Sequence, residues 1–209
     1  MPALRERASE ETGISLQLAL KLAAPYLAVG VFWSLLHNGW LAILAYHAQI
    51  LWWARGSFSG FTRPRRSLYA FMLVPAALTA PVLYVVIPLV AKVDLTSWLS
   101  AYAISGAGLV AMVFYYGLVH PVLEQVHWAP LREATPFAHA AFAGYHMLVL
   151  VSLLDLPWLA VCFAVLASAS WMWQRLTRES ASLFPAVASH VAADLGMVVV
   201  AALMAAARV

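Results

Sequence analysis

Long apolar runs separated by short polar breaks form the main pattern along this chain of 209 residues. A transmembrane helix needs about 20 apolar residues, and the spacing of the breaks is typical of such helices joined by short loops. The apolar runs, by residue number, are 16–36, 40–54, 68–91, 99–119, 136–154, 156–173 and 183–207. The pattern predicts an all-α protein, a polytopic transmembrane bundle of about six to seven spans. We expect it to be one transmembrane domain over residues 1–209, within which residues 1–15 form a polar amino-terminal segment.

The runs 16–36 and 40–54 make either two helices or one long broken helix, because only His37-Asn38-Gly39 lies between them and the second run is short. Basic residues favour the cytoplasmic side of a membrane. With two helices here, and with the arginine-bearing loop 55–66 inside, ten of the basic residues lie inside and two outside. We therefore expect two helices, seven spans and a cytoplasmic amino terminus.

Composition narrows the class of protein further. The chain is 64% hydrophobic and 10% charged, whereas soluble domains are about 45–50% apolar and 25% charged. This excludes a soluble globular enzyme and a disordered chain, and a single cysteine, Cys162, excludes an internal disulfide or a cysteine metal cluster. The net charge of +3 is too small to indicate nucleic-acid binding. Segment 1–15 lacks the order of a cleaved signal peptide, and we expect a multi-pass protein of a bacterial inner membrane.

Two acidic residues stand out against this apolar background. Asp194 lies inside the last apolar run, and Glu124 lies between the runs 99–119 and 136–154. An acidic side chain near the centre of a transmembrane helix costs about 2.5–3.5 kcal/mol on insertion scales, and such residues usually have a function. His146 and His190 also lie within apolar runs. These four residues are the candidates for chemistry.

Helical spacing groups these residues with others. His190 and Asp194 are four residues apart, so they share one helix face. Phe142 and His146 have the same spacing, and His139 shares their face.

Glu124 has His120 four residues before it and His127 three residues after it. Pro121 and Pro130 argue against a continuous helix here. A carboxylate close to two imidazoles in a low-dielectric cavity suits hydrolysis. The carboxylate can take a proton from water, and a further donor can stabilise the oxyanion.

In this order the motifs resemble those of the CPBP family of intramembrane proteases, which includes the type II CAAX prenyl endopeptidases and the bacterial Abi proteins. That family has a Glu-Glu-x-x-x-Arg motif, then Phe-x-x-x-His, then His-x-x-x-Asn or Asp. Here the matching residues are Glu124, Phe142 with His146, and His190 with Asp194. The resemblance covers about residues 99–207, which would form the catalytic core.

The resemblance implies a metal-independent glutamic endopeptidase that needs no cofactor. Glu124 would be the general base and would activate water together with His146. His190 and Asp194 would stabilise the oxyanion, Asp194 either protonated or by orienting His190. The implied partners are the lipid bilayer and a membrane-associated protein or peptide as substrate.

The first motif departs from the family pattern. Gln125 replaces the second glutamate and Ala129 stands at the arginine position. Arg132 could replace that arginine only if the backbone were rearranged. The candidate supporting residues are Phe142, His127, Gln125, Arg132 and His139.

Two alternatives remain open. The altered first motif is compatible with a non-catalytic relative that binds a partner or confers immunity. A metal or haem enzyme would use Glu124-x-x-His127, a di-iron element, with His146 and His190 as ligands, but only one such element is present. His37 and His47 are interpreted as structural, and Phe142 and Tyr145 as core packing in any case.

Overall fold

The computed structural model describes residues 15–54, 60–62 and 67–207, with the side chains of helix α4 described from Ala77 onward. Most of the polar amino-terminal segment and the arginines of the loop 55–66 lie outside the described residues. The expected positions of those arginines relative to the membrane therefore stay predictions.

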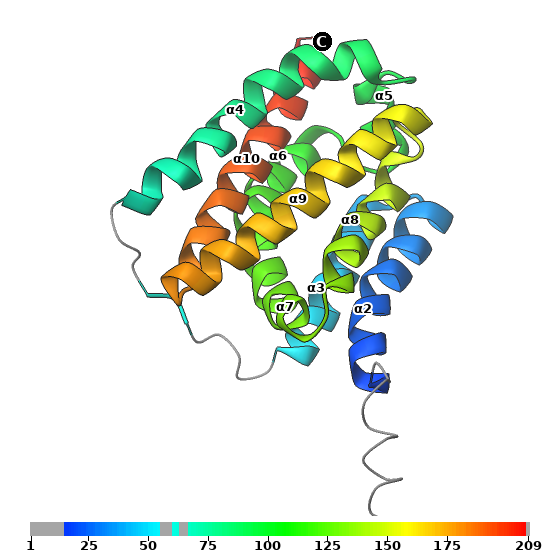
Figure 1. Ribbon diagram of the computed structural model, residues 1–209. Helices are drawn as coiled ribbons and strands as arrows, with labels where there is room; N and C mark the ends of the chain where they lie inside the picture. The colour runs from blue at the N-terminus through cyan, green and yellow to red at the C-terminus, as the bar shows by residue number, and fades with distance from the viewer. Residues whose placement is uncertain (1–14, 55–59, 63–66, 208–209) are drawn as a thin grey trace, which may run out of the picture.

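The described residues form helices joined by short turns, and no strand occurs among them (Figure 1). In chain order the elements are α2 (Leu16–Val29), η1 (Gly30–Leu35), α3 (Gly39–Trp53), α4 (Ser67–Val90), α5 (Leu95–Ala101), α6 (Gly106–Phe114), η2 (Tyr115–Val119), α7 (His120–Ala134), α8 (Phe137–Leu150), α9 (Leu156–Ser180) and α10 (Phe184–Ala206). Three of the helices adjoin a π-helical turn: α2 and α6 continue into one, and α7 follows directly from one.

Polar side chains start several of these helices. The Ser15 hydroxyl accepts the backbone N–H of Leu18, and the Asn38 side chain accepts that of Leu41 at 2.9 Å. Such caps satisfy backbone donors that have no partner inside the helix. Asn38 therefore separates α3 from η1, and the prediction of two helices in the first apolar region is confirmed.

Among the described residues, four helices are long and apolar enough to cross a membrane: Leu16–Leu35, Gly106–Ala134, Leu156–Ser180 and Phe184–Ala206. The expected six to seven spans are therefore only partly supported. Helix α3 has 15 residues and α8 has 14, which at about 1.5 Å per residue gives each roughly 22 Å. That is shorter than the hydrocarbon core of a bilayer, about 30 Å.

The expected span 99–119 is wrong in its limits. The helix starts at Gly106 and runs through α6, η2 and α7 to Ala134, so Glu124 lies within it. Pro121 does not break it, because the π turn η2 directly precedes this proline and α7 begins around it. A proline removes one helical hydrogen bond and crowds the carbonyl four residues back, and the wider π turn lies at that position.

Helix α7 lies at the centre of the bundle and packs against α3, α8, α9 and α10. Figure 1 shows α9 running obliquely across the front, with α4 and α2 on opposite flanks. The outer helices expose large apolar side chains such as Leu89, Leu156 and Val165. Polar side chains of α7, in contrast, are buried, and this arrangement collects the unusual residues of the sequence in the interior.

Candidate active site

Glu124 is the centre of the buried polar cluster, and its side chain has no solvent exposure. Its Oε1 accepts a hydrogen bond from the Tyr46 hydroxyl at 2.6 Å and another from the Tyr145 hydroxyl. Trp128 donates its indole N–H to the Tyr46 oxygen at 2.7 Å. Three aromatic side chains therefore fix one oxygen of the carboxyl group and its orientation.

The other oxygen, Oε2, faces two imidazoles. His120 Nε2 is 3.4 Å away and His190 Nε2 is 3.7 Å away. Within the described part of the chain, Oε2 has no hydrogen-bond partner. A buried oxygen without a partner costs free energy, so its presence calls for an explanation. Oε2 is also the atom of Glu124 that remains able to react.

His190 is held from three directions. Its ring stacks on Trp173, with ring centroids 4.2 Å apart. Its Nδ1 faces Gln125 Nε2 at 3.1 Å, and its Nε2 lies 3.3 Å from Asp194 Oδ2. The predicted proximity of His190 and Asp194 on one helix face is therefore present, and Glu124 lies beside them.

Gln125 and Arg132 interact without any rearrangement of the backbone, contrary to the expectation. The Arg132 Nη1 donates to Gln125 Oε1 at 2.8 Å across two turns of the continuous helix α7. Arg132 also donates to the Ser170 hydroxyl at 3.0 Å, and its guanidinium lies 5.7 Å from the ring centres of both Phe142 and Trp173. The arginine is buried, and it reaches Gln125 because its side chain is long enough to span the two helical turns.

His146 reaches Glu124 only through Tyr145. Its Nδ1 contacts the Phe142 carbonyl oxygen at 2.8 Å, and its Nε2 lies 3.1 Å from the Tyr145 hydroxyl. That hydroxyl in turn donates to Glu124. The expected partnership of Glu124 and His146 is thus indirect, and Phe142 both accepts from His146 and packs edge-on against its ring.

The remaining two candidates lie at the edge of the cluster. His139 contacts the Ser170 hydroxyl at 3.0 Å and Gln174 Oε1 at 3.1 Å, which links it to Arg132 through Ser170. His127 Nε2 contacts the Lys21 carbonyl oxygen at 3.2 Å, and the histidine of helix α7 that faces Glu124 is His120 rather than His127. His127 is therefore outside the site.

Three residues of the cluster, Tyr46, His47 and Tyr145, are not site candidates from the sequence, where His47 is interpreted as structural and Tyr145 as core packing. His120 is noted there for its spacing to Glu124. Tyr46 and His47 are neighbours in a largely apolar run, and an ionisable residue in such a run is a signal of function. Their contacts join α3 to α7 over more than seventy positions, as in the 2.9 Å contact of His47 Nε2 with His120 Nδ1. No local spacing rule predicts a contact of that kind.

Metal binding has no ready set of ligands in the described residues. Among them, no group of three or more His, Cys, Asp or Glu side chains has an arrangement that could hold a metal ion. Glu124 and His127, the single di-iron element, point to different partners. The metal or haem alternative therefore gains no support from this arrangement.

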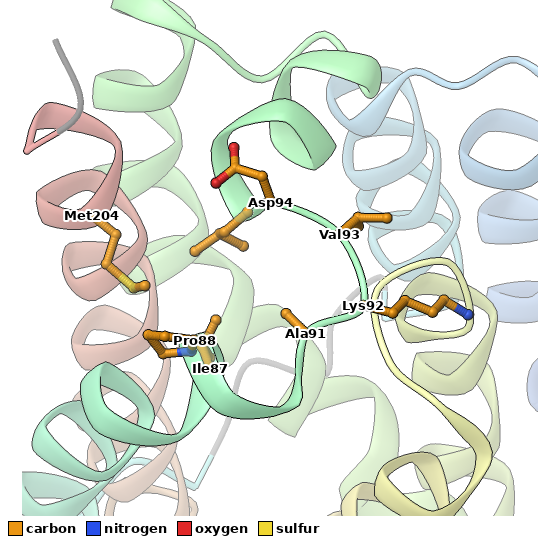
Figure 2. A pocket seen from close by; sticks show the side chains of 8 residues that line it. Ile87, Pro88, Ala91, Lys92, Val93, Asp94 and Met204 are labelled. Carbon is orange, nitrogen blue, oxygen red and sulfur yellow. The ribbon is translucent and has the colours of Figure 1, made fainter.

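A pocket of about 260 Å³ lies elsewhere, at the junction of α4, α5 and α10 (Figure 2). Its lining includes Lys92, Asp94 and Met204 and none of the residues around Glu124. Lys92 donates to the Val151 carbonyl oxygen at 2.7 Å, and Asp94 accepts the backbone N–H of Ser97 at 2.9 Å. The charged groups of this pocket are used to close turns and to start a helix.

No protein-family model, curated protein or solved structure matches this chain. The geometry of the buried cluster and the motif order are therefore what bears on function.

Proposed function

We propose that this protein is a membrane-embedded endopeptidase of the glutamate type, which hydrolyses a peptide bond of a membrane-associated protein or peptide. The observation that carries the proposal is Glu124 Oε2, a buried carboxyl oxygen with His120 Nε2 at 3.4 Å and His190 Nε2 at 3.7 Å. An acceptor flanked by two potential donors in a water-poor interior suits the activation of water.

In the proposed reaction Glu124 is the general base. Its Oε2 takes one proton from water while the water oxygen forms a bond to the carbonyl carbon, and the carbonyl π electrons move to the oxygen. His190 Nε2–H donates to that oxyanion. When the C–N bond breaks, the proton on Glu124 passes to the amine nitrogen, so the carboxylate is restored.

The neighbouring residues would act by positioning these two groups. Tyr46 and Tyr145 hold Oε1, so that only Oε2 is available to water. His146 Nε2 lies 3.1 Å from the Tyr145 oxygen and would help to hold that side chain in place. Asp194 lies 3.3 Å from His190 Nε2 and would orient that ring rather than donate to the oxyanion itself.

A second candidate is a non-catalytic membrane protein that acts by binding a partner. The complete burial of Glu124 favours it, because neither water nor a peptide reaches Oε2 in this arrangement without a movement of side chains. The substitution of Gln125 for a second glutamate points the same way.

The test uses purified protein in lipid vesicles and a library of synthetic peptides that each contain an apolar segment, with cleavage read by mass spectrometry. We expect the wild type to produce fragments and Glu124→Gln to lose about a hundredfold or more in rate, the usual effect of removing a general base. Glu133→Gln is the matched control, because Glu133 is an exposed carboxylate paired with Arg178. We expect this control to retain full activity.

Equal cleavage by Glu124→Gln, or no cleavage by a folded wild-type protein, contradicts the proposal. In the second case the partner-binding candidate predicts a further result. A Glu124→Ala/His146→Ala double variant would then rescue the phenotype of cells that lack the protein as well as the wild type does.

A further inference from the structure

A series of contacts leads away from Glu124 along the α3 side of the cluster. His120 Nε2 faces Glu124 Oε2, and His120 Nδ1 contacts His47 Nε2 at 2.9 Å. His47 Nδ1 then contacts the Tyr115 hydroxyl at 2.8 Å. Tyr115 is only half-buried and lies in the π turn η2, at the start of the segment that carries His120. The series thus links a fully buried carboxyl group to a side chain at the edge of the bundle.

Every member of this series can both donate and accept. A neutral imidazole donates from one nitrogen and accepts at the other, and a phenol does both at its oxygen. If Glu124 is ionised, the bonds run inward from Tyr115 to His47 and to His120, whose Nε2–H then faces Oε2 at 3.4 Å. If Glu124 is protonated, all of them reverse and run outward to the Tyr115 oxygen. Both states satisfy every contact, and they differ by one proton on Glu124.

On the α10 side of Glu124, the donor and acceptor roles cannot reverse in this way. Arg132 has donors only, so its bond to Gln125 Oε1 forces the Gln125 amide nitrogen towards His190. His190 Nδ1 must then accept, and the proton of the neutral ring must be on Nε2. His190 is therefore a fixed donor, whereas His120 can exchange its role.

The neighbours of His120 and His47 are compatible with a change of this kind. The His120 ring stacks on Tyr116, with centroids 4.4 Å apart, and meets His190 edge-on at 6.2 Å. The rings of His47 and His120 are inclined by only 24°, with centroids 5.2 Å apart, and they meet edge to edge through the contact of Nε2 with Nδ1. Because these contacts are made by ring faces and edges, a proton can move between the ring nitrogens while the rings stay in place.

We propose that Tyr115, His47 and His120 form a proton path. This path protonates and deprotonates Glu124 while the surrounding side chains stay in place. When Glu124 is protonated, each O–H or N–H bond that breaks is matched by one that forms at the next atom. The proton leaves the Tyr115 oxygen for His47 Nδ1, His47 passes one from Nε2 to His120 Nδ1, and His120 passes one from Nε2 to Glu124 Oε2. Tyr115 regains its proton from water, and deprotonation of Glu124 follows the same steps in reverse.

The experiment reads the protonated nitrogen of each histidine by ¹⁵N NMR of the purified full-length protein in lipid nanodiscs, near neutral pH. Histidine-to-asparagine variants assign the signals. Glu124→Gln keeps the bonds to Tyr46 and Tyr145 and places an amide NH₂ where Oε2 was. We expect His120 and His47 to switch together, from a proton on Nε2 to a proton on Nδ1. We expect His190 to keep its proton on Nε2, which also shows that the variant is folded.

A second variant tests whether protons travel along the path. Tyr115→Phe removes the outermost hydroxyl, and we expect exchange of the ring N–H protons of His47 and His120 with water to slow at least tenfold. Tyr102→Phe is the matched control, because the Tyr102 hydroxyl bonds to Ser152 and lies outside the path. We expect exchange in that variant to equal the wild-type rate.

A His120 that keeps its proton on Nε2 in Glu124→Gln overturns the proposal, as does a His190 that switches with it. Unchanged exchange in Tyr115→Phe does the same. None of these measurements needs a substrate, so the proton path and the proposed peptidase activity can fail independently of each other.

Discussion

Charged residues occur in two very different settings in this protein. In the pocket of Figure 2, Lys92 and Asp94 each bond to the end of a backbone segment, one at the Val151 carbonyl and the other at the Ser97 N–H. At the centre of the bundle, Glu124 has one oxygen held by two tyrosines and the other without a hydrogen bond among the described residues. Both settings contain an acidic residue close to apolar helices.

The difference shows that a charged side chain beside apolar helices is not by itself a sign of function. Asp94 satisfies donors that every helix leaves open at its start, so its role is local and structural. Glu124 costs stability where it stands, because a buried oxygen lacks a partner. Substitutions should therefore separate the two settings by their opposite effects on stability and activity.

The largest effect is expected from Arg132→Ala in the central cluster. The substitution removes two bonds from a charged donor, to Gln125 and Ser170, and leaves both partners buried. We expect the free energy of unfolding to fall by about 3 kcal/mol or more. The measurement is denaturant unfolding in mixed micelles, and a loss below about 1 kcal/mol would show that the cluster tolerates an unpaired Gln125.

Glu124→Gln should act in the opposite direction on stability. Its amide NH₂ can donate to His120 Nε2, which satisfies the position that Oε2 leaves open. We expect the free energy of unfolding to rise by about 1–2 kcal/mol, while peptide cleavage is lost. A less stable Glu124→Gln protein in the same unfolding assay would mean that the carboxylate contributes to stability, as Asp94 does.

Asp94→Ala should lower the free energy of unfolding and leave the rate of peptide cleavage unchanged. It removes the side chain that caps helix α5, and the loss of such a cap costs about 1 kcal/mol. Unfolding and peptide cleavage measured on one preparation test both halves of this statement. A loss of cleavage in a folded Asp94→Ala protein would break the distinction between the two settings.

Arg178→Ala provides the baseline for the other three and should have the smallest effect. Arg178 pairs with Glu133 at 2.7 Å, but both side chains are about half exposed, at 61% and 49%. Exposed ion pairs contribute little, so we expect a loss of about 0.5 kcal/mol or less. If the free energy of unfolding falls by more than this, the effects of the other three substitutions must exceed that larger value before they can be attributed to the contacts they remove.

The sequence predicted the parts of the site that depend on helical spacing. His190 and Asp194 share a face and lie within 3.3 Å, and Glu124 lies beside them. The motif order also singled out Gln125 and Arg132, although not their contact, because a reach over two helical turns requires that the helix continue past Pro130. The hydrophobic pattern does not show whether a helix continues through a segment that contains prolines.

The parts that could not be predicted depend on packing between distant segments. Tyr46 and His47 reach the site from α3, and nothing in their spacing to Glu124 indicates this contact. The number of spans is only partly supported for a related reason, since the apolar runs 40–54 and 136–154 contain helices of 15 and 14 residues, shorter than the hydrocarbon core of a bilayer. Composition shows that a segment avoids water, and length decides whether it can span.

The π turn η2 also sets the rotational phase between the two halves of the long helix that contains Glu124. One residue corresponds to about 100° around an α-helix, so a turn that holds an additional residue rotates all that follows relative to all that precedes. Before the turn, Val110 and Phe114 face outward, and after it nearly every side chain from His120 to Trp128 is buried. Removing a single residue from Tyr115–Val119 would realign the halves as one regular helix. Glu124 would then turn away from His190 without any change in its own neighbourhood of sequence.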